Sequence, residues 1–144
     1  MSREVLEYLK TQRVGVLAVE MLDGSPHGAT VHFAHTEDPF VFYFETRRGY
    51  RKAEPLLKNK NTRATFVVGV NDADKKTLQI DGVARVLDDE KIESFEEVYF
   101  AKFPDKRVKY EKENFLIFCL EPTWWRFTDW TAPGGKLILI SDSI

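Results

Sequence analysis

The segment FVFYFETRRGYRKAEPLLKNKNTRATFVV, residues 40–68, contains the pattern that best predicts the fold of this 144-residue chain. It begins with an apolar run that has no polar face, which is typical of a strand buried on both sides. A turn containing Gly49 follows, and then Pro55, which is tolerated only in the first turn of a helix. We therefore expect a short helix that begins near Lys52 or Ala53, followed by a second strand from residue 62.

Positive charge is concentrated in the middle of this segment. Residues 47–63 contain seven basic residues and one acidic residue, a charge of +6, whereas the whole chain carries -2, so the remainder sums to -8. Arg51 and Lys52 would lie beside free backbone N–H groups at the start of the expected helix, and Thr46 would add a hydroxyl at the end of the strand. A guanidinium fork, an ammonium and a helix N-terminus together suit a dianionic phosphate.

Two other interpretations of the basic segment are a solvated charged face and a surface that binds polyanions. The rest of the chain is acidic and its aromatic residues lie in core-like apolar runs. Nucleic-acid binding usually needs a basic domain with accessible stacking residues. We therefore expect no nucleic-acid partner.

Shorter patterns on either side predict strands joined by tight turns. Residues 14–21 and 27–35 flank Asp23-Gly24, a strong hairpin signal. Residues 78–87 alternate between apolar and polar, and Gly82 within them predicts a bulge or a bend. Residues 115–130 predict a long final strand, broken at Pro122, and residues 88–103 predict the clearest helix, which ends before Pro104. This arrangement favours a mainly β, mostly antiparallel barrel with short flanking helices, and a single domain over residues 1–144.

The composition narrows the class of protein further. With 43% hydrophobic residues the chain has enough apolar side chains for a full core. Cys119 is the single cysteine, which excludes an internal disulfide framework and a cysteine-rich zinc site, and its apolar neighbours predict a buried thiol. No apolar run approaches the ~20 residues of a membrane span, and the N-terminus lacks a signal-peptide core. We expect a soluble, cytoplasmic protein with no membrane partner.

Histidines and tryptophans are each clustered in one stretch. On a continuous strand, His27 and His35 would share one face about 26 Å apart while His32 faced the other way, so we expect no metal site. All three tryptophans lie in TWWRFTDW, residues 123–130. Aromatic residues on both faces of a late strand suit either core packing or a subunit interface.

The order of these features resembles the pyridoxamine 5′-phosphate oxidase-like FMN-binding split barrels. The resemblance covers roughly residues 3–100 and rests on VGVLAV after the first helix, on SPHGATVHF leading into residues 40–66, and on LQIDGVARVLDD. It implies a six- to seven-stranded antiparallel split β-barrel that binds FMN. It also implies a homodimer, with one cofactor in each of two clefts at the interface.

The resemblance also implies which residues hold the cofactor. Arg51 and Lys52 match the Arg-Lys pair that holds the FMN phosphate in this family, with Thr46 as a hydroxyl partner and Arg48 as a further candidate. Tyr50 departs from the family pattern, in which a small serine frequently precedes that pair. The implied contacts to the flavin ring come from the second expected strand, from the start of the strand with Gly82, and from tryptophans of the partner subunit: Thr30, Val31, His32, Thr77, and Trp125 or Trp130.

The resulting functional hypothesis is an FMN-dependent oxidoreductase that moves hydride or electrons between a reduced nicotinamide, or a similar donor, and a small-molecule acceptor. No paired-carboxylate, Ser-His-Asp or Cys-His arrangement is visible, so catalytic residues remain unknown. Pyridoxamine phosphate oxidase itself is not expected, because its C-terminal Arg-His motif has no counterpart here. The alternatives are a non-catalytic binder of FMN, heme or a deazaflavin on the same fold, and an anion-binding barrel.

Overall fold

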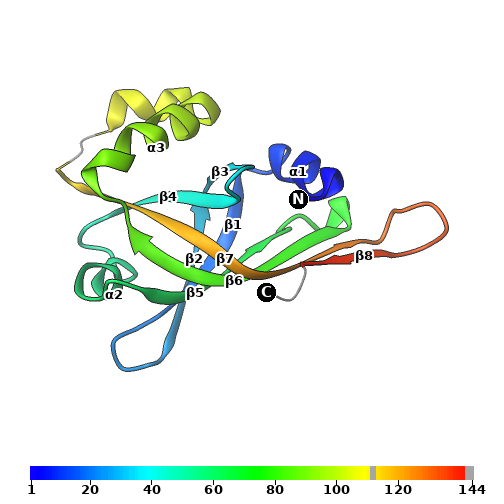
Figure 1. Cartoon of the computed structure of the whole chain (residues 1–144), viewed down its shortest axis with the longest axis horizontal. Coiled ribbons are helices and arrows are strands. Elements are labelled where there is room, and N and C mark those ends of the chain that lie inside the picture. Colours follow the sequence, from blue (N-terminus) through cyan, green and yellow to red (C-terminus); the bar gives the residue numbers. More distant parts are fainter. Residues whose placement is uncertain (111–112, 142–144) are drawn as a thin grey trace.

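Eight strands form one curled antiparallel sheet in the computed structural model, which describes residues 1–110 and 113–141 (Figure 1). The strand order is β2-β1-β5-β6-β7-β4-β3, and β8 pairs with β7. The strands are β1 (Val14–Glu20), β2 (Pro26–His32), β3 (Ala34–Thr36), β4 (Val41–Arg47), β5 (Thr62–Val68), β6 (Lys76–Val86), β7 (Phe115–Asp129) and β8 (Leu137–Ile140). This confirms the predicted mainly β split barrel.

In the described residues, three α-helices lie at the periphery of the sheet. They are α1 (Arg3–Lys10), α2 (Ala53–Lys58) and α3 (Asp89–Lys102), and two short 3-10 helices, η1 (Asp72–Asp74) and η2 (Pro104–Lys109), are also present. The predicted start of the short helix near Lys52 or Ala53 agrees with α2. Within the described residues, no helix has the length and apolar character needed to cross a bilayer.

The sheet has seven strands along its main path, with β8 beside β7, and the expected strand over residues 27–35 is divided in two. β2 ends at His32 and β3 begins at Ala34, with Phe33 between them. The backbone N–H of Phe33 donates to the carbonyl of Arg13 at 3.2 Å. Its fully buried ring packs edge-on against Phe66, with the ring centroids 5.2 Å apart, so burial of this ring accompanies the break in the strand.

β4 and the first half of β7, residues 116–120, are covered on both faces, which explains the apolar sequences of these segments. Inside the barrel, Phe44 stacks on Phe118 with ring centroids 5.1 Å apart. On the opposite face, α3 packs Phe95 into a second core that also contains Ile117 and Cys119. Burial raises the pKa of the Cys119 thiol to about 11, so the predicted buried thiol is confirmed and stays protonated at neutral pH.

The predicted break of the last long strand at Pro122 is wrong, because β7 runs without interruption from Phe115 to Asp129. The irregularity is a bulge: Asp81 pairs with Trp124 and Gly82 pairs with Pro122, which leaves Thr123 as the extra residue of β7. The hydroxyl of Thr123 donates to the carbonyl of Asp81 at 3.2 Å. The bulge predicted at Gly82 is confirmed, and it accommodates a proline that has no N–H to give to the ladder.

Gly82→Ala is expected to lower the free energy of unfolding by about 1–3 kcal/mol. An added Cβ would lie 2.4 Å from the carbonyl oxygen of Glu121, a backbone atom that cannot rotate away. Urea denaturation of the purified variant measures the change. Gly28→Ala on β2 is the matched control, because its Cβ would meet nothing closer than 3.9 Å. Equal stability of the two variants would contradict the close approach at the bulge.

Candidate functional site

An unpartnered hydroxyl lies at the end of β4. Thr46 is 3% exposed, and its Oγ1 is buried without a hydrogen-bond partner. It is held there by the β4–β7 ladder, in which it pairs with Leu116. A buried hydroxyl without a partner destabilises a protein by about 1–3 kcal/mol, so a ligand oxygen that accepts from it would gain a bond at little further cost.

The basic turn predicted from the sequence directly follows this strand. Backbone bonds from Tyr50 to Arg47 (3.1 Å) and from Ala53 to Tyr50 (3.0 Å) fold it tightly into the start of α2. Lys52 occupies the N-cap position of α2 and is 9% exposed. Its ammonium lies 5.0 Å from the centroid of the Tyr50 ring, and burial lowers its pKa. Because α2 has only six residues, the side chains rather than a helix dipole would have to attract an anion.

The cations of this turn have no carboxylate partners among the ion pairs formed within the described residues. The Arg48 Nε donates instead to the carbonyl of Glu113 at 3.2 Å. Arg51 is exposed, and its charge contributes to the lowered pKa of Asp23 in the β1–β2 turn, after the larger effect of a hydrogen bond from the Ser25 hydroxyl. A buried hydroxyl without a partner and two cations that form no ion pair within the described residues fit the phosphate group of a cofactor.

The residues that are predicted to contact the flavin ring, Thr30, Val31 and His32, lie on β2, a different strand from the one that leads into the basic turn. Thr30 and His32 are exposed and Val31 is 7% exposed, as expected for an alternating strand. The His32 ring meets the edge of Phe103, with centroids 5.2 Å apart. Partial burial, followed by the charge of Lys106, lowers the pKa of His32, so its imidazole is neutral at neutral pH.

Thr77 and Trp130 are brought together in a cavity of about 470 Å³ between η1, β6 and the end of β7. Thr77 pairs with Thr128 in the ladder, and the N–H of Trp130 donates to the carbonyl of Lys75 at 3.0 Å. The Trp130 ring is 51% exposed. Trp125 is not part of this cavity: it packs against the core of its own barrel.

The predicted cofactor residues therefore fall into three groups within one chain. The first is the end of β4 with the basic turn, the second is β2, and the third is the cavity with Thr77 and Trp130. None of these groups by itself surrounds a flavin-sized ligand.

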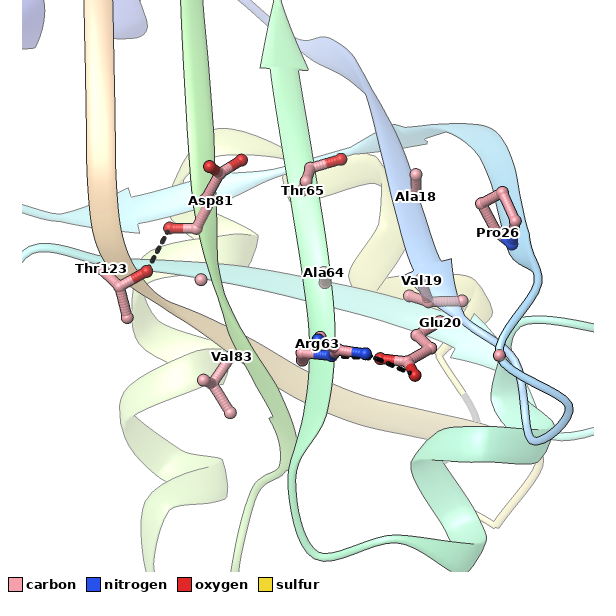
Figure 2. A pocket seen from close by; sticks show the side chains of 12 residues that line it. Ala18, Val19, Glu20, Pro26, Arg63, Ala64, Thr65, Asp81, Val83 and Thr123 are labelled. Carbon is pink, nitrogen blue, oxygen red and sulfur yellow. Dashed lines mark hydrogen bonds and ion pairs between the residues drawn. The ribbon is translucent and has the colours of Figure 1, made fainter.

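Sequence reasoning missed a hollow of about 530 Å³ on the outer face of the sheet, over β1, β5, β6 and β7 (Figure 2). Figure 2 shows the small side chain of Ala18 near Thr65 and Asp81 on the neighbouring strands. At one end Arg63 donates to Glu20 at 2.8 Å. Two small residues in the sequence, Ala18 on β1 and Gly82 at the bulge, could have indicated this hollow, because they cover little of the sheet.

The same outer face is apolar beside the hollow. Val16 and Val67 are cross-strand partners on β1 and β5 and are 37% and 39% exposed. Exposed apolar pairs on a sheet face are typical of a surface that contacts another protein.

Residues 1–129 of the chain match the sequence model of a protein family, pyridoxamine 5′-phosphate oxidase. No curated protein matches the sequence. The fold is similar to that of a heme binding protein from Mycobacterium smegmatis (12% identity, TM-score 0.71), whose structure covers 91% of this chain while this chain spans only 54% of that protein. It is also similar to a conserved hypothetical protein from Mycobacterium tuberculosis (21% identity, TM-score 0.68, 90% and 85% covered). A third similar structure is an FMN binding protein from Nostoc punctiforme, related to pyridoxamine 5′-phosphate oxidase (13% identity, TM-score 0.67, 96% and 88% covered).

Thr46→Val is expected to raise the free energy of unfolding of the cofactor-free protein by about 1 kcal/mol, because a methyl replaces a buried hydroxyl that has no partner. Thr62→Val is the matched control: Thr62 is also 3% exposed, but its hydroxyl donates to the carbonyl of Pro55 at 3.4 Å. That variant should be less stable than the wild type in urea denaturation. Equal destabilisation of both variants would show that the Thr46 hydroxyl has a partner in the cofactor-free protein.

Proposed function

The chain belongs to the pyridoxamine 5′-phosphate oxidase family, and on that premise we propose that it binds FMN and acts as an oxidoreductase. It would pass hydride or electrons between a reduced nicotinamide, or a similar donor, and a small-molecule acceptor. The observation that carries the proposal is the buried hydroxyl of Thr46, which has no hydrogen-bond partner among the described residues. It is followed in the chain by cations that take part in none of the ion pairs found in that part of the chain. FMN, when bound, supplies hydride and one-electron chemistry.

The chain's own residues hold the cofactor in this proposal. The guanidinium of Arg51 and the ammonium of Lys52 bind the phosphate oxygens, and the Thr46 hydroxyl donates a further bond. Arg48, which is already bonded to a backbone carbonyl, is an additional phosphate contact. On the ring side, the backbone of residues 30–32 meets the edge of the flavin, and Thr77 contacts it from β6.

A homodimer is the second part of the proposal. It is supported by the exposed Val16–Val67 pair and by the hollow beside it. Figure 1 shows the β7–β8 hairpin extending away from the barrel. Trp130 directly follows the last residue of β7 and begins the loop of this hairpin, from which it would reach the cleft of a partner. A cofactor site shared between two chains accounts for the three separate groups of residues seen in one chain. Sedimentation equilibrium of FMN-loaded protein that gives the mass of one chain would contradict the dimer.

A second candidate function is a non-catalytic cofactor carrier. The likeness in fold to a heme binding protein, at a TM-score of 0.71, favours heme as its cofactor. The exposed His32 would then be a candidate iron ligand, since neutral imidazole is a common metal ligand.

The first test is a visible spectrum of the purified protein followed by titration with FMN and with riboflavin, which lacks the phosphate. We expect the wild type to bind FMN at one per chain and riboflavin more weakly. Arg51→Ala combined with Lys52→Ala should weaken FMN binding by about 100-fold, because two charge-assisted bonds are lost, and should leave riboflavin binding nearly unchanged.

Lys58→Ala combined with Lys60→Ala is the matched control, since it removes the same charge from exposed positions just beyond the turn. Equal loss of FMN affinity in the two double variants would show that the loss comes from the change in overall charge. It would then refute the assignment of Arg51 and Lys52 to the phosphate. A heme Soret band in place of flavin absorption would favour the second candidate.

Turnover separates the oxidoreductase from the carrier. Under anaerobic conditions, we expect NADH or NADPH to bleach the flavin absorption near its visible maximum, and an added quinone or oxygen to restore it over many cycles. Stopped-flow absorbance gives both rates. Flavin that stays oxidised in the presence of both nicotinamides would overturn the nicotinamide-dependent activity while leaving the binding proposal intact.

A further inference from the structure

A second cavity, of about 410 Å³, lies between α1, β3 and the C-terminal half of α3. It is lined by Lys10, Ala34, His35, Glu37, Val98, Ala101 and Lys102, and by none of the residues proposed to hold FMN. This cavity is therefore separate from the proposed cofactor site.

The amine of Lys102 is the unusual group in this region. Its Nζ is buried and has no hydrogen-bond partner. It lies 3.9 Å from the centroid of the Phe33 ring and 5.6 Å from that of Phe103. Lys10 lines the same cavity but forms an ion pair with Glu37 at 3.3 Å. Ring faces replace only part of the hydration that an ammonium loses on burial, so this environment favours the neutral amine.

Neighbouring positive charge acts in the same direction. The Arg13 guanidinium lies 4.7 Å from the Phe103 centroid, and the Lys106 ammonium lies 5.2 Å from the same ring and 3.7 Å from Glu45. Burial first, and the charge of Arg13 second, lower the pKa of Lys102 from 10.5 to about 8. At neutral pH the unprotonated fraction is then about two orders of magnitude larger than for an ordinary lysine.

His35 gives the cavity a group that can carry a proton. Burial, followed by the charge of Lys102, lowers its pKa to about 4, while the charge of Glu37 opposes this shift. The imidazole is therefore neutral at neutral pH and has both an acceptor nitrogen and a donor nitrogen.

We propose that Lys102 is a carbonyl-reactive amine and that this cavity takes small uncharged aldehydes. The nitrogen lone pair forms a bond to the aldehyde carbon, and the carbonyl π pair moves to oxygen. The carbinolamine then loses its hydroxyl group as water, which leaves an imine on Lys102. Amine plus aldehyde gives imine plus water, so no oxidant or reductant is needed. Both N–H hydrogens of the amine end on the oxygen, the first in the carbinolamine hydroxyl and the second in the departing water. Neutral His35 relays each proton, accepting it at one ring nitrogen while the other ring nitrogen donates.

The lining selects this class of ligand. Ala34, Val98 and Ala101 provide a short apolar wall for an aliphatic chain. The cavity's other lysine, Lys10, is already paired with Glu37, so the described lining offers no second unpaired cation to bind a carboxylate or phosphate on the ligand.

Reductive alkylation of the wild-type protein tests the proposal. Acetaldehyde and sodium cyanoborohydride are added at pH 7.4, and ethylation of each lysine is followed over time by mass spectrometry of peptides. We expect the initial rate at Lys102 to exceed that at Lys58, an exposed lysine of α2, by at least about tenfold. Between pH 6 and 10 the rate at Lys102 should rise with a midpoint near 8.

Several outcomes would overturn the proposal. One is labelling at Lys102 no faster than at Lys58 at pH 7.4, and another is a pH profile that follows Lys58. Fast labelling that persists at the same site in 6 M guanidinium would show that the sequence, and not the cavity, activates the amine. His35→Gln should slow labelling at Lys102 without moving its pH midpoint, and an unchanged rate would remove His35 from the reaction. Because the comparison between lysines uses wild-type protein, it does not depend on a variant folding.

Discussion

Pairing between β4 and β7 is the constraint on which the rest of the structure depends. β7 carries β6 on one edge and β4 on the other, so this one strand joins the two halves of the sheet. Its backbone pairs Thr46 with Leu116, which fixes where β4 ends and where the basic turn begins. Burial on both faces, against the barrel core and against α3, leaves the pair little freedom to shift register, because a shift of one residue would exchange the two faces.

The two candidate sites use the same residue type in opposite ways. Lys52 lies in the basic turn, largely buried, with its ammonium near the exposed ring of Tyr50. The Nζ of Lys102 is buried near two phenylalanine rings, and Lys102 lines a cavity of uncharged and paired side chains. In both places an ammonium lacks a carboxylate partner among the described ion pairs. Lys52, which is flanked by the other cations of the basic turn, suits ionic recognition of a cofactor, and Lys102 suits nucleophilic chemistry.

Local sequence signals predicted the elements that depend on neighbouring residues. The apolar run at 40–46, the proline in the first turn of α2 and the glycine at the bulge each gave a correct element or irregularity. The two wrong predictions involve tertiary contacts. Pro122 was expected to break β7, but Gly82 on the neighbouring strand absorbs the irregularity. The strand expected over residues 27–35 divides at Phe33, whose ring is buried against Phe66 from β5.

The candidate site was predictable only in part for the same reason. The basic turn is contiguous, so its cations and Thr46 were visible in the sequence. The roles of Thr30–His32, Thr77 and the tryptophans came from resemblance, and they stay predictions. The cavity at Lys102 joins segments around residues 10, 35 and 102. No local pattern marks such a cavity, because the environment of each side chain is set by the other two segments.

The β7–β8 hairpin has a consequence for how molecules of this protein meet one another. Within the described chain, β8 pairs only with β7, so the N–H and C=O groups along its other edge face outward beside the exposed side chains of Ile138 and Ile140. Such an edge is a template for pairing with another chain. β8 has only four residues, so an encounter between two such edges forms few hydrogen bonds and is short-lived. The shortness of this strand therefore keeps a projecting hairpin from becoming a seed for fibrous assembly as the protein concentration rises.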